Sequence, residues 1–208
     1  MEDIYIIGAS GFAKEVYSLI VIEKKYIVRG FIDFKPQDDF LVFKDSKIPI
    51  IDEDTFLKEK ELYNSNVAIG IGSPKVIETI FKKYKNYKFP NIISSKAIIG
   101  IDVEFGKGNI VTQNVIFTTH IKVGDGNIFN LSSTVGHDCA IGNFNVINPA
   151  VNISGGVKLG NGNLLGVGSI ILQYINIGSL NIIGGSSLVT KSIEDNKLVI
   201  GVPGKIKE

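Results

Sequence analysis

The sequence has few of the residues that would indicate disulfides, metal chemistry or binding to polyanions. Its single cysteine, Cys139, excludes an internal disulfide framework and is typical of a reducing cytoplasm. The only two histidines, His120 and His137, form no Cys/His cluster with metal-ligand spacing, so we expect no metal. With 22 basic and 21 acidic residues, the charge is nearly balanced and favours neither nucleic acid nor an anionic membrane. Small-molecule chemistry or protein contact remains.

Long hydrophobic runs are also missing near the start of the chain. The first three residues, Met1 to Asp3, are acidic rather than basic, and the apolar run Ile4–Ile7 stops at Gly8. We therefore expect neither a signal peptide nor a membrane span, and we expect the protein to be cytoplasmic.

Glycine is abundant, and a six-residue repeat explains its placement. Every sixth residue from Ile93 to Val189 is apolar, at seventeen positions without exception. If about half of residues are apolar, chance would give this roughly once in 100,000 trials. A period of six fits neither an α-helix nor a simple strand. It predicts a solenoid in which three hexapeptides form a triangular coil and Gly or Asn accepts positive φ at the corners. A purely structural solenoid is the alternative.

The first 90 residues show strands alternating with helices. We expect a small α/β unit of the βαβαβ type with a parallel sheet, so the predicted domains are residues 1–90 and 91–208. The expected elements are a strand at Ile4–Ile7, a helix up to Ile22, a strand at Tyr26–Ile32, a weak helix after Asp54, a strand at Val67–Ile71 and a helix from Lys75 to about Tyr87.

A glycine turn follows the first predicted strand. Gly8 and Gly11 form a degenerate version of the dinucleotide fingerprint, and the N–H groups that open the next helix favour a phosphate. Asp33, at the end of the second strand, is placed to meet a ribose or a base. A half-domain of this size suits a mononucleotide or a nucleotide-sugar better than NAD. The alternative is a purely structural turn.

His137 is the best candidate for chemistry. It lies two positions after the inward residue Val135, so its side chain is expected to point away from the coil interior. A neutral imidazole accepts a proton from an attacking amine or hydroxyl, and Asp138 is placed to orient it. Cys139 falls in a column of small residues and is interpreted as core rather than as a nucleophile. His120 is interpreted as a surface or corner residue.

Four segments together resemble the NeuD/PglD-type sugar acyltransferases. They are Ile7 to Gly11, Gly30 to Asp33, Gly136 to Cys139, and Gly201 to Lys205. The resemblance implies a left-handed parallel β-helix and a homotrimer. It also implies transfer of an acyl group from acetyl-CoA, or another acyl-CoA, to the amine of a dTDP- or UDP-linked 4-amino-4,6-dideoxysugar for surface glycan biosynthesis. Sialic acid O-acetylation and a non-catalytic nucleotide-sugar-binding scaffold are the alternatives.

The resemblance also assigns roles to residues. It makes His137 the base and Asp138 its partner. The residues implied to bind the nucleotide-sugar are Gly8, Ser10, Gly11, Asp33 and Ser73, and those implied to bind CoA between subunits are Gly155, Val167, Gly185 and Lys205. The sequence departs from the family where histidine is frequent, at Phe12, Ser94 and Val146. An apolar Val146 would leave room for an acyl chain longer than acetyl, so the acyl length stays open.

Overall fold

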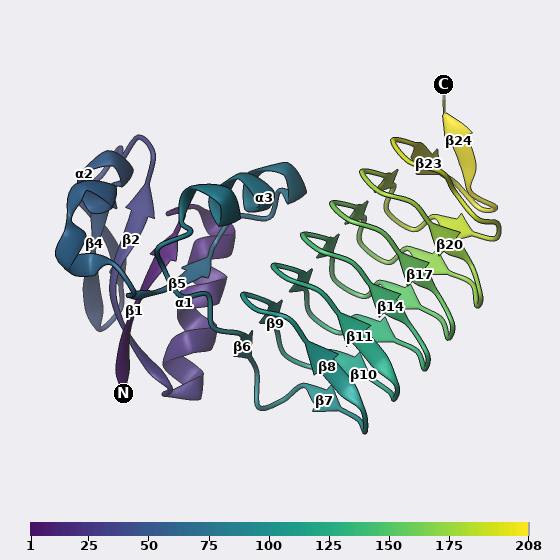
Figure 1. Ribbon diagram of the computed structural model, residues 1–208, viewed down its shortest axis with the longest axis horizontal. Helices are drawn as coiled ribbons and strands as arrows, with labels where there is room; N and C mark the ends of the chain where they lie inside the picture. The colour runs from purple at the N-terminus through teal and green to yellow at the C-terminus, as the bar shows by residue number, and fades with distance from the viewer. Residues whose placement is uncertain (208) are drawn as a thin grey trace.

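The computed structural model describes residues 1–207, and its N-terminal domain, β1 to α3, lies at one end of a long solenoid (Figure 1). This domain has one sheet with the strand order β3-β4-β2-β1-β5, in which β1 is parallel to both β2 and β5. Its elements are β1 (Glu2–Ile7), α1 (Gly11–Glu23), β2 (Tyr26–Asp33), β3 (Phe40–Phe43), β4 (Ser46–Asp52), α2 (Glu53–Lys58), the 3-10 helix η1 (Lys60–Leu62), β5 (Asn66–Ile69) and α3 (Pro74–Lys83).

The parallel strands and the helices that connect them confirm the predicted βαβαβ unit. The antiparallel hairpin of β3 and β4 was not predicted, because its short strands are only partly buried and lack a regular apolar alternation. Helix α3 ends at Lys83 rather than near Tyr87, because Tyr84 and Tyr87 leave the helix to pack in the core beside Phe56. Strand β4, which lies between β3 and β2, pairs in parallel with β2.

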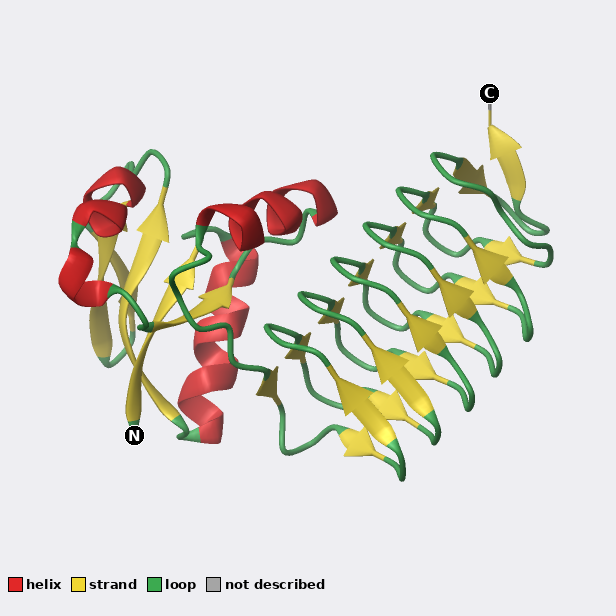
Figure 2. Ribbon diagram, in the orientation of Figure 1, coloured by secondary structure: helices red, strands yellow, loops and turns green. Residues whose placement is uncertain are grey.

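Stripes of buried apolar residues position the helices of this domain. Helix α1 buries Ala13, Val16, Leu19 and Ile20. Helix α3 begins with Pro74, whose missing N–H costs nothing in a first turn, and it buries Ile77 and Ile80. All the α-helices of residues 1–207 lie in this domain (Figure 2), and none of them is long and apolar enough to cross a bilayer.

The rest of the chain winds into triangular coils. Each strand pairs in parallel with the strand 18 residues later, as Ile116 does with Thr134. We call the three sheets face one, face two and face three, in the order in which a coil visits them, and name each corner by the faces it joins. This arrangement confirms the predicted left-handed parallel β-helix.

The strands of the solenoid are short. Face one consists of β6 (Ile92–Ile93), β9 (Ile110–Val111), β12 (Ile128–Phe129), β15 (Val146–Ile147), β18 (Leu164–Leu165), β21 (Ile182–Ile183), β23 (Leu198–Ile200) and β24 (Lys205–Lys207). Face two consists of β7 (Ile98–Ile99), β10 (Ile116–Phe117), β13 (Thr134–Val135), β16 (Asn152–Ile153), β19 (Ile170–Ile171) and β22 (Leu188–Val189). Face three consists of β8 (Val103–Phe105), β11 (Ile121–Val123), β14 (Ala140–Ile141), β17 (Lys158–Leu159) and β20 (Asn176–Ile177).

The predicted apolar register forms the inner core. From Val111 to Val189 every residue of the register is buried. Ile93, Ile99 and Phe105 are less buried because they belong to the first coil, which has no coil beneath it. Asparagine side chains form a column at the three–one corner. Their amide groups hydrogen-bond between successive coils, as from Asn145 to Asn127 at 3.0 Å, and these bonds satisfy buried polar groups.

The prediction that Gly or Asn accepts positive φ at the corners holds at some of them, namely Gly108, Gly126, Gly156, Gly162, Gly168 and Asn114. The residue with positive φ is the third after each inward residue, and it is often not glycine: Asp102, Asn114, His120, Ser132, Asp138, Phe144, Ala150, Tyr174, Leu180 and Ser186 all have φ near 60°. The glycines that directly follow inward residues lie outside this region. They are needed for space instead, since a Cβ on Gly136 would lie 2.5 Å from the backbone nitrogen of Gly155 in the next coil.

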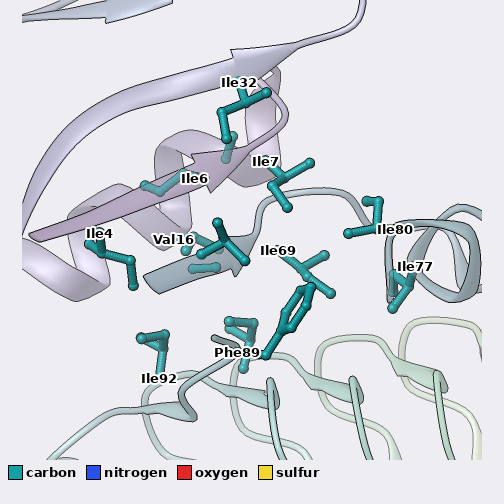
Figure 3. Packing of buried hydrophobic residues seen from close by; sticks show 14 of the residues in the cluster. Ile4, Ile6, Ile7, Val16, Ile32, Ile69, Ile77, Ile80, Phe89 and Ile92 are labelled. Atoms are coloured by element: carbon teal, nitrogen blue, oxygen red, sulfur yellow. The ribbon is translucent and has the colours of Figure 1, made fainter. Parts of the chain in front are cut away.

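The N-terminal domain packs on the outer side of face one. The outward residues Ile92, Ile110, Ile128 and Val146 share one buried cluster with the core of the domain. Figure 3 shows Phe89 and Ile92 between the sheet and the first coils. Because the two–three corner of a triangular coil lies opposite face one, the domain leaves that corner uncovered.

Candidate active site

His137 lies at the two–three corner, two residues after the end of β13. Its Nδ1 is 2.7 Å from Oδ2 of Asp138, and both side chains are more than half exposed. A carboxylate only accepts hydrogen bonds, so Nδ1 donates its proton to Asp138. Among residues 1–207, Nε2 has no hydrogen-bond partner, which leaves its lone pair free to accept a proton from a ligand.

Gly155, one coil further along, makes room for this imidazole. A Cβ on Gly155 would lie 2.5 Å from Nε2 of His137, so the ring rests directly over the glycine. Within the described residues, the N–H of Gly155 has no backbone acceptor, and the same holds for Thr119 and Gln173 in this column. Gly155 differs from them in having no side chain to cover its N–H, which suits a donor to a developing oxyanion.

The ring of His120, the other histidine, forms a hydrogen bond through Nδ1. Thr119 Oγ1 donates to the carbonyl of Ile101 at 2.8 Å, so it accepts a hydrogen bond from Nδ1 of His120 at 2.8 Å. The Nε2 atom lies 3.4 Å from a carboxylate oxygen of Asp102. His120 is therefore an exposed corner residue, as the sequence indicated, with a carboxylate beside its second ring nitrogen.

Cys139 points into the solenoid core. Its Sγ donates to the carbonyl of Ser154 at 3.2 Å, and burial raises the pKa of the thiol. A protonated, buried thiol is a poor nucleophile. The interpretation of Cys139 as a core residue is thus confirmed. No group of three or more His, Cys, Asp or Glu side chains within residues 1–207 has a geometry that would hold a metal ion.

A cavity of about 400 Å³ opens at the carboxyl ends of β1 and β2. Gly8 and Asp33 line it, together with Phe34 and an ion pair between Glu53 and Lys83. Strand β1 lies between β2 and β5, so the crevice is at the point where the strand order reverses. Ligands of open α/β sheets bind in this kind of crevice.

The other residues predicted to bind the nucleotide-sugar spread around this crevice. Gly8 has a φ of 103°, and a Cβ there would lie 2.7 Å from Ile71, so only glycine fits. Ser10 lines a smaller cavity of about 190 Å³ that shares Asp33 with the first. Gly11 opens α1, whereas Ser73 precedes α3 and lines neither cavity.

The residues predicted to bind CoA lie at separate places in one chain. Gly155 is at the two–three corner with His137, whereas Val167 and Gly185 are at the one–two corner, on the other side of face two. Lys205, in β24, lines a cavity of about 430 Å³ with Lys191 at the C-terminal end of the solenoid. One chain alone therefore does not bring these four residues together.

Two of the departures from the family have structural explanations. Val146 is buried between face one and the N-terminal domain, so the expectation that it leaves room for a longer acyl chain is wrong. Its side chain cannot border a substrate because the domain covers it. Ser94 is likewise buried and donates to Glu23 at 3.2 Å, which ties the first coil to α1.

Two features of the site were missed by the sequence reasoning. The carboxylate of Glu53 is fixed by Lys83 and Tyr84 beside the larger cavity. Tyr174, which follows β19, lies near Gly155 at the His137 corner. The 18-residue spacing of Thr119, His137 and Gly155 was the signal that would have shown which residues stack at this corner.

Residues 3–84 match the PglD N-terminal domain family. No curated protein matches the sequence. Among solved structures, PerB from Caulobacter crescentus, in complex with CoA and GDP-perosamine, is 28% identical, with a TM-score of 0.90 over 100% of this chain and 98% of that chain. Other structures of that enzyme, described as a perosamine N-acetyltransferase, carry one histidine replaced by asparagine or alanine.

Two further structures share the fold over the full length of both chains. WeeI from Acinetobacter baumannii AYE is 25% identical with a TM-score of 0.82, covering 100% of each chain. The acetyltransferase domain of PglB from Neisseria gonorrhoeae FA1090 is 23% identical with a TM-score of 0.89, again covering 100% of each chain. The architecture, an α/β domain on a hexapeptide β-helix, is therefore common to all of these proteins.

Proposed function

We propose that this chain, whose N-terminal domain belongs to the PglD N-terminal domain family and whose whole fold is that of sugar N-acetyltransferases of the PglD/NeuD type, is a CoA-dependent N-acyltransferase. Its acceptor is the amino group of a nucleotide-linked sugar, and its role is in surface glycan biosynthesis. A 4-amino-4,6-dideoxysugar carried by dTDP or UDP, and a cytoplasmic location, are the finer parts of this proposal. The observation that carries it is the His137–Asp138 pair, with Nε2 free, at an open corner of this fold.

The reaction follows from that geometry. The neutral amine attacks the thioester carbonyl while Nε2 of His137 takes one proton from the attacking nitrogen. The C–N bond forms, the C–S bond breaks, and the proton passes from His137 to the CoA thiolate, giving the amide and free CoA. Asp138 stabilises the imidazolium, and the N–H of Gly155 is the candidate donor to the oxyanion.

Acyl-CoA fits the C-terminal side of the same corner. Lys191 stands 54 residues, or three coils, after His137 in the same corner column. At about 4.8 Å per coil this is roughly 14 Å. Lys191 and Lys205 line one cavity there and offer two ammonium groups to the CoA phosphates, with the thioester extended toward His137.

The separation of the proposed binding residues from His137 within one chain supports a homotrimer. The nucleotide-sugar crevice belongs to a domain packed on face one, whereas His137 stands at the opposite corner of the same solenoid. Val167 and Gly185 lie at another corner again. In a trimer of parallel solenoids, a neighbouring subunit supplies the binding residues that lie too far from His137 in the same chain. We therefore propose that each active site is shared between subunits.

Release of free thiol from acetyl-CoA tests the proposed activity. The purified protein is incubated with acetyl-CoA and a panel of GDP-, UDP- and dTDP-linked amino sugars, with sialic acid as a separate acceptor. Thiol release that depends on an amino sugar, with an amide in the product, is the expected result. Turnover on sialic acid alone would establish O-acetylation instead. Binding of a nucleotide-sugar without any thiol release would establish a non-catalytic scaffold.

Mixing inactive variants tests the shared site. Light scattering should give the mass of a trimer for the wild type. The assay uses a nucleotide-sugar concentration far below the KM expected for Asp33→Ala, so that His137→Asn and Asp33→Ala proteins are each weakly active alone. They should recover activity when unfolded and refolded together, because some mixed sites contain both wild-type residues. A fully active monomer, or no recovery in mixed trimers, would contradict the shared-site proposal while leaving the acyl transfer itself in place.

A further inference from the structure

Tyr174 is an exposed aromatic residue in an unfavourable backbone conformation. Its φ is 60°, a region that costs a residue with a side chain about 1 kcal/mol or more relative to glycine. The residue is 71% exposed, so it does not contribute to the inner core. It occupies the corner position of its coil at the two–three corner, two coils after Asp138 in the same column.

The tyrosine and the histidine converge on two adjacent glycines. A Cβ on Gly156 would lie 2.3 Å from Cδ1 of Tyr174, so this ring rests on Gly156 as the imidazole of His137 rests on Gly155. His137 belongs to the preceding coil and Tyr174 to the following one. The two rings therefore rest on consecutive residues of the same coil, whose Cα atoms are about 3.8 Å apart.

The backbone holds this arrangement. Gly156 N–H donates to the carbonyl of His137 at 2.7 Å, and Tyr174 N–H donates to the carbonyl of Gly155 at 2.9 Å. These two backbone hydrogen bonds therefore connect His137 and Tyr174 through the two glycines. Other corners fill the equivalent position with residues that carry a side chain, so it is the lack of space beneath the tyrosine that requires glycine at Gly156.

We propose that Tyr174 is the wall of the acyl pocket and restricts the donor to acetyl-CoA. This rests on the proposed acyl transfer at His137. The thioester must lie beside Nε2 when the amine attacks, and CoA reaches that point from the C-terminal side, where Lys191 and Lys205 lie. Tyr174 rests on Gly156, the residue after Gly155, so an acyl chain that leaves the thioester carbon across this glycine meets its ring, which fills the space that a third or fourth acyl carbon would need.

A packing role without substrate contact is the competing explanation, and the chain offers a matched control for it. Leu180 also has a φ of 60°, is exposed, and rests on the corner glycine of the preceding coil, Gly162, where a Cβ would lie 2.9 Å from Cδ2 of Leu180. It lies at the three–one corner, away from His137. Truncating Leu180 removes the same kind of side chain-on-glycine contact outside the site.

The experiment measures kcat/KM with acetyl-CoA, propionyl-CoA and butyryl-CoA, using the amino-sugar acceptor, for the wild type and for Tyr174→Ala, Tyr174→Phe and Leu180→Ala. The wild type should prefer acetyl-CoA. In Tyr174→Ala the ratio of butyryl to acetyl kcat/KM should rise about tenfold or more, since one methylene in a pocket is worth roughly that factor. Tyr174→Phe and Leu180→Ala should keep the wild-type ratio. Thermal melting of all four proteins reports whether they remain folded.

Two results would overturn this inference: a wild-type enzyme that prefers butyryl-CoA, or a folded Tyr174→Ala protein with an unchanged acyl preference. An equal shift in Leu180→Ala would assign the effect to packing and overturn it as well. A wild type that transfers no acyl group from any of the three donors would instead contradict the proposed function, so the two failures are distinguishable.

Discussion

The N-terminal domain and the β-helix place their functional residues by different means. In the domain, Gly8 and Asp33 meet because parallel strands end at the same edge of a sheet. In the β-helix, His137 and Gly155 meet because every residue stacks on the one 18 positions later. A site of the first kind depends on loops between unlike elements, whereas a site of the second kind depends on which side chains occupy one corner column.

This difference suggests that the two regions have separate roles. The domain presents a crevice that suits binding of a nucleotide, and the solenoid presents an open corner with a free imidazole nitrogen. Binding and proton transfer should therefore respond to different substitutions. The following predictions test that separation, beginning with the largest expected effect.

His137→Asn should lower turnover by roughly a hundred- to ten-thousand-fold, the usual contribution of a general base. The affinity for the nucleotide-sugar should stay near that of the wild type, because the crevice is in the other domain. Asp33→Ala should do the reverse, raising KM with little change in kcat. Steady-state kinetics at saturating acyl-CoA, with calorimetric binding of the nucleotide-sugar, measures both. Retention of more than a third of turnover in His137→Asn would refute its role as the base.

Ile153→Asp should destabilise the solenoid by several kcal/mol, because it buries a charge without a partner in the inner column. Asn152→Asp, one position earlier on the same strand, points outward and should change stability by no more than about 1 kcal/mol. Thermal or urea unfolding measures the difference. Equal stability of the two variants would mean that the inward register does not carry the core.

Gly155→Ala should reduce kcat by about a hundredfold, the cost typical of displacing a catalytic group by roughly 1 Å. The new methyl group would lie 2.5 Å from Nε2 of His137 and would push the ring away. Gly72→Ala is the control, because a Cβ there meets no atom within 4 Å. Kinetics and melting curves of both variants measure these effects. A Gly155→Ala protein that is folded and fully active would contradict this prediction.

Cys139→Ala should leave turnover within about threefold of the wild type and cost roughly 1 kcal/mol of stability. Burial raises the pKa of the Cys139 thiol, so less thiolate is present at any given pH than for an exposed cysteine. Alkylation by iodoacetamide at pH 7.5 should therefore be slow in the folded protein and fast in urea. Rapid labelling of the native enzyme with parallel loss of activity would restore the nucleophile hypothesis.

The sequence by itself determined the solenoid and the exposure of His137. A six-residue register is a short-range pattern, and its repetition gives every coil the same core, so the inward column from Val111 to Val189 followed directly. The outward direction of His137 followed from its place two residues after Val135. The alternation of strands and helices likewise predicted the parallel core of the first sheet.

Only the tertiary structure decided which side chains meet. The burial of Val146 and the convergence of Tyr174 with His137 both depend on contacts between residues far apart in the sequence. Such contacts require the exact length of a coil and the positive φ at each corner, which set residues 18 positions apart on top of one another. They also require the N-terminal domain to occupy face one, since that choice buries Val146 and leaves the His137 corner open.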